Sequence, residues 1–478
     1  MSQDKTEEFI DDKKRQEGKL NSLKDAAAVN ATAGFGDYYI NAFAIAIKAS
    51  ANQIGLLASL PNLLAPISQL YTSRLMERMS RKKIFSIAIF LQGLMWIPII
   101  LTGLLYFKGM QHAPLFLVIF YTIYIIFGNF AMPAWSSWIG DLIEKKDISN
   151  FFSLRSRIGS VTALVALIIG GFALDFFKNK TEYHGEFLLF AGFAILFFLA
   201  MIFRLLSRHY VLKQYEPKFR FKKKYYFSFR QFVKEAPKRN YGNFALYSAL
   251  IVMATNVAGP YYSLYMLRNL QFSYIQFMLT MVASTVGTFF FMPLWSKFSD
   301  QYGNVNTLRI SGFLIPLMCF FWPISVFLLM PLKFYFLLGT SFFGGFAWAG
   351  FNLASASFVY DAATPERRSL CVAYSNVLNG LGVVLGTTIG GLLISALKIS
   401  FIDVIMFVSL VSGIARYGVS FLMVSRITEV REIEKEPTLR VVPLFSQLIN
   451  IPLYAQNLII VMGGIPRIII KKTFQRPD

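Results

Sequence analysis

Charged residues, cysteine and histidine are all scarce in this chain. Only 15% of its 478 residues are Asp, Glu, Lys or Arg, it has two cysteines and three histidines, and 55% of it is apolar. A soluble domain with a water-facing surface rarely has this composition. Cys319 and Cys371 both fall inside apolar runs, so we interpret them as small buried hydrophobes rather than as a disulfide. The histidines lie in separate loops, and we therefore predict no metal or cofactor site.

Two sequence patterns are also missing. No glycine-rich loop ends in Lys followed by Ser or Thr, the motif that binds the phosphates of ATP, so ATP-driven transport is not expected. The first 25 residues are polar and charged and contain no apolar core, so we do not expect a cleaved signal peptide. An enzyme within the membrane would need a convergent nucleophile, base or metal set, and the sequence does not favour that alternative.

Long apolar runs dominate the rest of the chain. About 20 apolar residues cross the hydrocarbon of a bilayer, and the runs predict an all-α membrane protein with twelve transmembrane helices in two pseudo-symmetric six-helix halves. The expected division is a cytoplasmic N-terminal tail that looks flexible (1–25), a first half (26–206), a basic cytoplasmic linker (207–240), a second half (241–424) and a cytoplasmic tail with an interfacial apolar segment (425–478). The runs begin near Ala27, Gln53, Ile84, Pro114, Ile158, Phe187, Phe244, Tyr274, Thr307, Phe334, Val372 and Phe401.

The two halves repeat one another in sequence. An offset of 223 residues carries Gly36, Tyr38 and Tyr39 onto Gly259, Tyr261 and Tyr262, and an offset of 220 carries Asp141 onto Asp361. Internal duplication of spanning segments is typical of transporters whose halves are related by an axis along the membrane normal.

Basic residues are distributed unevenly between the loops. The net charge is +21, yet only seven basic residues fall in the alternate loops that would face outward. By the positive-inside rule both termini are therefore cytoplasmic, and the charge favours anionic membrane lipid over nucleic acid as a partner. We expect an integral protein of the plasma membrane. The seven are Lys48, Lys108, Lys178, Lys180, Arg268, Lys333 and Lys398.

The loop after the second predicted helix carries a family resemblance. Residues 73–83 read SRLMERMSRKK, which resembles the signature of the major facilitator superfamily: Gly, three residues, Asp, two residues, Gly, Arg, then Arg or Lys. Ser73 and Ser80 stand at the glycine positions, and the echo after the eighth helix places Asp300 and Gly303 at the acid and the second glycine. The stretch from Asn256 to Met266 resembles a prokaryotic group of this family whose substrates are unassigned.

This resemblance implies a cytoplasmic gate. In the family, the loop acid and its basic neighbours interact across the cytoplasmic ends of the two halves, and further charges flank helices four and five and their repeats. A plain alternative is that each is an ordinary solvated loop charge. The gate candidates are Glu77, Arg78, Arg81, Asp141, Arg155, Arg157, Asp300, Gly303, Asp361 and Arg367.

One acid is expected near the middle of the first helix. An ionisable side chain at that depth is costly and usually functional, and Asp37 has Tyr38 beside it and Asn41 on the same face. We expect Asp37 to couple transport to a proton or monovalent cation; the alternatives are an acid satisfied by neighbouring amides, or direct substrate binding. The repeat places Pro260 opposite Asp37, which predicts a bend in the seventh helix.

Other polar side chains within helices are candidates for contacting the substrate, although each can equally join two helices. The predicted function is a secondary active transporter, working as a monomer, that moves a small molecule by alternating access. A lipid translocase and a transporter-like sensor are the alternatives. The candidate residues are Gln69, Asn129, Trp135, Asn256, Tyr261, Tyr262, Trp348, Asn352, Asn376 and Asn379.

Overall fold

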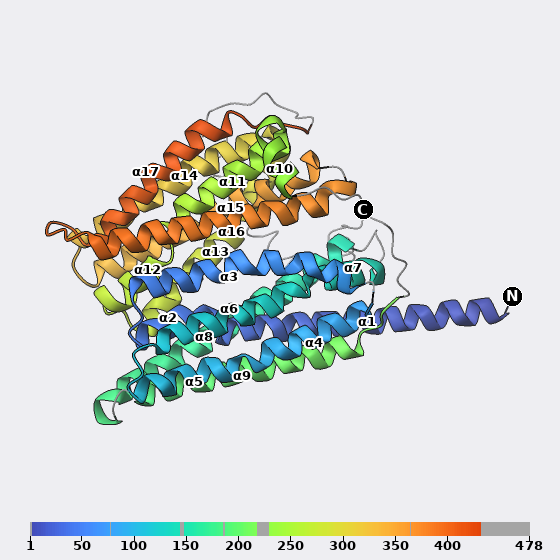
Figure 1. The fold of residues 1–478 in the computed structure, drawn as a ribbon, viewed down its shortest axis with the longest axis horizontal. Helices are drawn as coiled ribbons and strands as arrows, with labels where there is room; N and C mark the ends of the chain where they lie inside the picture. The colour runs from blue at the N-terminus through green and yellow to red at the C-terminus, as the bar shows by residue number, and fades with distance from the viewer. Residues whose placement is uncertain are drawn as a thin grey trace, which may run out of the picture.

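The computed structural model describes residues 2–76, 78–143, 148–184, 187–217, 229–363 and 365–431, and its regular elements there are helices (Figure 1). The N-terminal half forms one bundle and the C-terminal half a second bundle beside it. Ten helical stretches within these ranges are long and apolar enough to cross a membrane. The first two predicted spans, near Ala27 and Gln53, fall on helices that are not among these ten. The fold is therefore all-helical, as predicted.

Among the described residues, the first half has nine α-helices, several of which are consecutive pieces of one longer helical stretch. They are α1 (Ser2–Phe35), α2 (Ile40–Ala46), α3 (Ala51–Leu75), α4 (Arg81–Leu94), α5 (Trp96–Phe107), α6 (Ala113–Phe130), α7 (Met132–Leu142), α8 (Ile148–His184) and α9 (Phe187–Lys213).

The second half follows the short helix α10 (Phe229–Glu235). Its helices are α11 (Asn240–Asn256), α12 (Tyr261–Leu264), α13 (Tyr274–Tyr302), α14 (Asn304–Ile324), α15 (Leu332–Ala362), α16 (Pro365–Ala396) and α17 (Val404–Val424), with a π-helical turn at Tyr265–Asn269.

The first helical stretch of each half is interrupted at matched positions. α1 ends at Phe35, and a 3₁₀ turn (Asp37–Tyr39) leads into α2. Gly36 sits at this break because a β-carbon there would lie 2.3 Å from the Trp96 ring. In the second half α11 ends at Asn256, and Pro260 precedes the first residue of α12. The bend predicted at Pro260 is confirmed, since proline cannot supply the helical N–H.

Two helix pairs hold the halves together. α3 packs along α16, where Gly380 lies against the backbone of Asn62 and Leu63. α8 packs on α13, where Gly171 faces Met278. Small residues at these contacts let the helices approach closely. Figure 1 shows α3 and α16 running side by side through the middle of the molecule.

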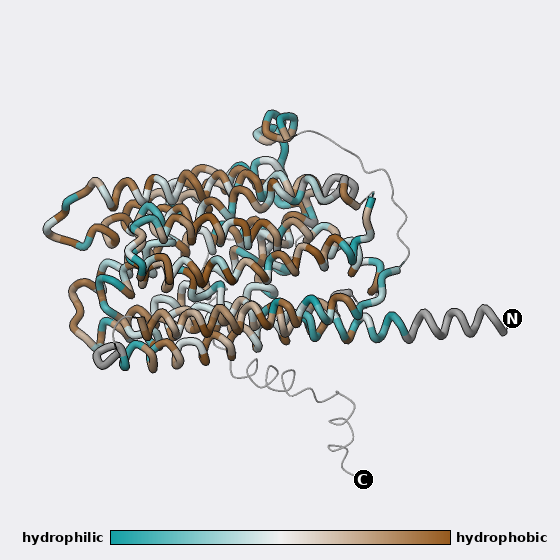
Figure 2. The backbone as a smooth tube through the Cα atoms, turned by 60° about the horizontal axis from the view of Figure 1, so that its bottom comes forward, coloured by the Kyte–Doolittle hydropathy of each residue, from teal (hydrophilic) through white to brown (hydrophobic). Residues whose placement is uncertain are grey.

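The apolar core differs between the two ends of the bundle. One large cluster draws residues from both halves, including Phe43, Phe193, Tyr261, Tyr274 and Phe334. The clusters at the opposite end each belong to a single half; one contains Trp138 and Val211, and another contains Phe244 and Phe358. Hydrophobic residues dominate the middle of the helices, and polar ones gather at the end from which α1 projects (Figure 2).

Two predicted segment boundaries differ from the structure. The segment expected to be a flexible tail (1–25) is helical from Ser2 onward, as part of α1. Its last turns pack against the bundle, where Ser22 and Asp25 are almost fully buried. α9 continues seven residues past position 206 to Lys213, and α10 forms within the linker, where Phe232 packs on Tyr241 and Tyr374. The predicted interfacial segment after position 447 lies outside the described residues.

Candidate functional site

Asp37 lies in the 3₁₀ turn between α1 and α2 and faces α6. The Tyr124 hydroxyl on α6 donates a hydrogen bond to Asp37 Oδ2 at 3.3 Å. Tyr124 is itself fixed by stacking on Tyr121 and by contact with Trp96, whose ring centroid is 4.8 Å away. The other carboxyl oxygen, Oδ1, is buried and has no hydrogen-bond partner among the described residues. A buried polar atom left unpaired is costly, so this oxygen is available to bind a proton or cation.

A chain of buried polar groups leads from this region toward the end from which α1 projects. Arg204 on α9 lies close enough to Asp37 for electrostatic attraction, and its Nε donates to Gln92 Oε1 at 2.7 Å. Arg204 also donates to Ser207 Oγ at 3.1 Å, and that hydroxyl donates to Asp25 Oδ1 at 2.6 Å. Buried charges are tolerated where such partners satisfy them.

The chain ends in an ion pair between α1 and α8. Arg155 Nη2 is 2.8 Å from Asp25 Oδ2, and the side chains of the two residues are 13% and 2% exposed. Arg155 also donates to the carbonyl and hydroxyl oxygens of Ser22. Its guanidinium lies over the Trp135 ring, 4.8 Å from the centroid. Arg155 therefore binds within its own half, and Trp135 supports it rather than facing an open site.

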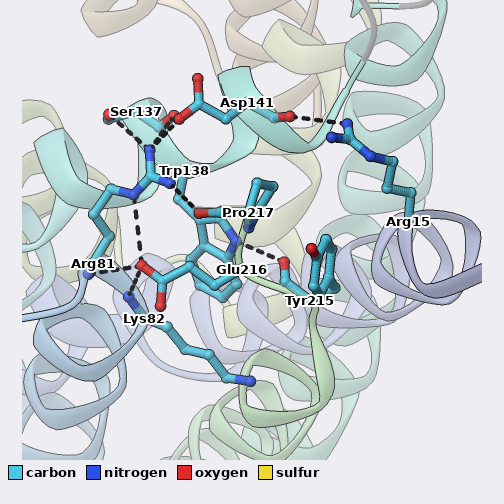
Figure 3. A network of polar contacts seen from close by, with 9 residues as sticks. All are labelled: Arg15, Arg81, Lys82, Ser137, Trp138, Asp141, Tyr215, Glu216 and Pro217. Atoms are coloured by element: carbon cyan, nitrogen blue, oxygen red, sulfur yellow. Dashed lines mark hydrogen bonds and ion pairs between the residues drawn. The ribbon is translucent and has the colours of Figure 1, made fainter. Parts of the chain in front are cut away.

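Arg81 forms the centre of a clasp at the same end of the first half (Figure 3). Its side chain is 1% exposed and donates to Asp141 Oδ2 at 2.5 Å and to the Pro217 carbonyl at 3.1 Å. Glu216 Oε1 accepts from the Arg81 backbone N–H at 2.9 Å, which caps the start of α4. The Trp138 indole donates to the Tyr215 carbonyl at 2.8 Å. These bonds fasten the chain leaving α9 onto the third and fourth spans.

The second half repeats this clasp with different residues. Asn304, which stands 223 positions after Arg81, donates to Asp361 Oδ2 at 2.8 Å. Glu429 Oε2 accepts from the Val305 backbone N–H at 2.8 Å and caps α14, as Glu216 caps α4. Arg431 lies 3.2 Å from Asp300 and 3.6 Å from Asp361. In both halves the chain that follows the last span folds back over the acid predicted as a gate.

The two signature loops use their second glycine position differently. Gly303 has φ of 86°, a conformation that favours glycine, and it ends α13 and starts α14. Ser80 has φ of −63° and caps α4, its hydroxyl accepting from the Lys83 N–H at 3.3 Å. Serine therefore replaces glycine because this copy of the loop is a helix cap and not a left-handed turn.

The contact between α8 and α13, which joins the two halves, includes an acid that the sequence analysis did not select. Asp175 on α8 accepts from the Tyr274 backbone N–H at 2.7 Å, and so caps the start of α13 across the interface. Lys178 lies over the Tyr274 ring at 5.6 Å from its centroid, and Phe193 contacts the same ring at 5.6 Å. Asp175 is only 9% exposed.

The gate candidates other than Arg81, Arg155 and Gly303 divide into three groups. Asp141, Asp300 and Asp361 bind partners within their own half, as described above. Arg78 and Arg157 are exposed. Glu77 and the Arg367 side chain lie outside the described residues.

Several amide and aromatic candidates connect helices. Gln69 donates to Asn129 at 3.3 Å between α3 and α6, and Ser248 donates to Asn379 at 3.1 Å between α11 and α16. Tyr262 bonds Ser409 at 2.7 Å and stacks on Trp322. Tyr261 is buried and donates a hydrogen bond to the Thr387 carbonyl of α16.

The other candidates make contacts within one helix or are described by their exposure alone. Asn256 donates to the Val252 carbonyl in its own helix, and Trp348 packs on Phe351. Asn41 and Asn376 are half-buried, and Tyr38 and Asn352 are exposed.

Two buried arginines were also missed by the sequence analysis. Arg204 and Arg416 lie inside apolar runs, and their membrane depth was the signal that could have selected them. Arg416 on α17 donates to the Thr255 carbonyl at 3.2 Å, in the last turn of α11 before its break. A cation there complements the negative end of a helix. Within the described ranges, no three His, Cys, Asp or Glu side chains gather to hold a metal ion.

Several solved structures have a similar fold. The nucleoside transporter NupG is 15% identical, with a TM-score of 0.59 over 86% of this chain and 98% of its own. A bacterial homologue of the iron transporter ferroportin in an inward-facing state is 12% identical, with a TM-score of 0.64 over 87% of this chain and 99% of its own. The inward-open xylose transporter XylE from E. coli is 14% identical, with a TM-score of 0.60 over 87% of this chain and 96% of its own.

Sequence comparisons place the chain in a family. No curated protein matches it. The model of the Major Facilitator Superfamily matches twice, over residues 26–243 and 244–468, which correspond to the two halves. The family resemblance seen in the signature loops is thereby confirmed, and membership of this family indicates a membrane transport protein. The chain belongs to the Major Facilitator Superfamily.

Proposed function

We propose that the protein is a secondary active transporter that moves a small solute across the plasma membrane by alternating access. In this proposal the α1–α2 segment and α3 are the first and second of twelve spans, and two six-helix halves rock about the α3–α16 and α8–α13 contacts. Support comes from the repeated breaks in the first span of each half and from the separate clasp in each half. Each half then moves as one body.

We further propose that this structure represents a state open to the cytoplasm. The apolar cluster shared by both halves includes Phe43, Tyr274 and Phe334, close to the loops that the charge pattern places outside. At the other end Arg81 binds Asp141 and Arg431 binds Asp300, each pair within one half. Apolar burial between the halves therefore favours closure on the outer side.

We propose that Asp37 couples transport to a proton or a monovalent cation. The observation that carries this proposal is the buried, unpaired Oδ1 beside the Tyr124 bond and within reach of the Arg204 charge. Neutralising Asp37 removes its attraction to Arg204, so occupancy of this site changes the forces between the first and sixth spans. The site thus joins ion binding to a hinge, the break at Gly36.

A flux experiment tests the coupling. Purified protein is first screened for thermal stabilisation by small solutes, and each hit is then followed into proteoliposomes with and without a proton or sodium gradient. We expect Asp37→Asn to abolish gradient-driven accumulation while solute exchange persists. Glu17→Gln is the matched control, since Glu17 is an exposed acid on α1, the helix that precedes the Asp37 turn. Accumulation that survives in full in Asp37→Asn would sink the coupling role, whereas loss of both activities would indicate substrate binding.

A further inference from the structure

A groove on the outside of the first half lies between α1, α8 and α9. Its volume is about 370 Å³, and its walls include Ala31 of α1, Val161 and Val165 of α8, and Phe203 of α9. α1 contributes three alanines, Ala27, Ala28 and Ala31, and these short side chains leave the hollow. The groove is therefore an apolar trough that follows the direction of the helices.

The mouth of the groove faces the hydrocarbon of the bilayer. Val161, Val165 and Ile169 recur at four-residue spacing on α8 and are 58%, 50% and 50% exposed. α8 is one of the stretches long and apolar enough to cross a membrane. Exposed apolar residues in the middle of a spanning helix meet lipid, so a lipid chain is the occupant that can reach the groove.

Two basic residues flank the end of the groove that the charge pattern of the loops assigns to the cytoplasmic side. Lys24 lines it directly, with its ammonium 5.9 Å from the Tyr210 ring centroid, and Arg157 lies one helical turn before Val161 on α8. The Asp25–Arg155 ion pair brings these stretches of α1 and α8 to the same depth. Lys24 and Arg157 are both exposed, whereas the neighbouring acid Asp25 is engaged by Arg155 and Ser207.

We propose that the groove binds an anionic phospholipid of the cytoplasmic leaflet, with one acyl chain along the alanines of α1 and the phosphate between Lys24 and Arg157. The apolar trough provides the binding surface for the acyl chain, and the two cations at its end favour a negatively charged headgroup. A basic residue near an anionic lipid surface strengthens binding by about fivefold. Losing both cations should therefore weaken binding by about 25-fold.

Lipid retention by the full-length protein tests this site. Detergent-purified protein is titrated with palmitoyl-oleoyl phosphatidylglycerol or phosphatidylcholine, and bound lipid is counted by native mass spectrometry beside the unfolding temperature. We expect preferential retention of phosphatidylglycerol, and its loss in Lys24→Gln with Arg157→Gln. Lys180→Gln, at the far end of α8, is the matched control and should retain the lipid.

Two further arms separate the headgroup from the chain. Val165→Trp fills the trough while keeping both cations, and we expect it to reduce retention of both lipids. Soluble glycerol 3-phosphate should not raise the unfolding temperature, because two exposed cations bind a phosphate only weakly when no acyl chain fills the trough. Equal retention of the two lipids, retention unchanged in the double variant, or full stabilisation by glycerol 3-phosphate would each overturn the proposal.

Discussion

Tyr39 and Tyr261 make the same contact in the two halves. Each donates its hydroxyl hydrogen to a carbonyl of the neighbouring spanning helix, Tyr39 to Leu167 and Tyr261 to Thr387, and these carbonyls are 220 positions apart. Each ring also packs on a matched glycine, Gly170 or Gly390. Both tyrosines thus tie the helix that follows a break to a helix at the interface between the halves.

Removing either hydroxyl should weaken the protein to a similar extent. We expect Tyr39→Phe and Tyr261→Phe each to lower the free energy of unfolding by about 0.5–1.5 kcal/mol, the net value of one hydrogen bond. Scanning fluorimetry in detergent measures this as a drop in unfolding temperature. Tyr335→Phe, at a 62% exposed tyrosine, should change nothing. A loss confined to one of the two buried variants would show that the positions are not equivalent.

The Asp25–Arg155 ion pair gives a prediction of larger size. Arg155→Met leaves the Asp25 carboxylate buried and without its cation, which costs about 3–5 kcal/mol in comparable cases. We expect a marked loss of folded protein, and partial recovery when Asp25→Leu is added, because both charges are then gone. The check is folded yield by size-exclusion chromatography and unfolding temperature. Additive effects of the two changes would mean that the residues do not interact.

Cross-linking the outer contact should hold the protein in one state. Asp175 caps α13 through the Tyr274 N–H, so these backbones approach closely. With Asp175→Cys and Tyr274→Cys combined, oxidation should stop net transport, and a reducing agent should restore it. Cys319 and Cys371 are buried, so they do not compete readily. Each single variant is the control, and transport by fully cross-linked protein would contradict alternating access about this contact.

The two capping glutamates should act locally and independently. Glu216→Gln weakens the charged cap of α4, and Glu429→Gln that of α14, each by up to about 1 kcal/mol. Hydrogen exchange of the first amides of the affected helix should then become up to about fivefold faster, with no change in the other half. Glu235→Gln removes an exposed pair with Arg239 and serves as the control. Faster exchange in both halves would indicate that the clasps are coupled.

Much of the fold followed from the sequence, because membrane spans and internal repeats leave strong patterns. The alignment of those repeats was less accurate at the first break. The offset of 223 pairs Tyr39 with Tyr262, but their contacts pair Tyr39 with Tyr261. Tyr262 instead bonds Ser409 in the last span. The π-helical turn after Leu264 shows that backbone winding differs between the halves here, and sequence spacing does not report it.

The sequence pointed to candidate residues but not to the partners that these residues contact in the structure. Asp37, Arg81, Asp141 and Asp361 were identified, since charges at predicted depths or repeat positions stand out. Their partners come from distant segments: Tyr124 from the fourth span, and Glu216 from a loop with no recognisable motif. Asp25 was assigned to a tail because the polar sequence around it gives no sign that one side of this helix is buried. Buried polar groups find their hydrogen-bond partners on segments that are distant in the sequence, so these partners can be identified only in the folded structure.

The first clasp also limits how far the halves can move apart. Pro217 is bonded to Arg81 in one half, and Phe229, which begins α10, packs on Tyr374 in the other. Only the twelve peptide steps from Pro217 to Phe229 span the two anchors, and a fully extended chain covers about 42 Å in that length. The greatest possible separation of the two halves at this point is thus set by where the chain is fixed on each half. Breaking the hydrogen bond between Arg81 and the Pro217 carbonyl would lengthen the free connection without adding a residue.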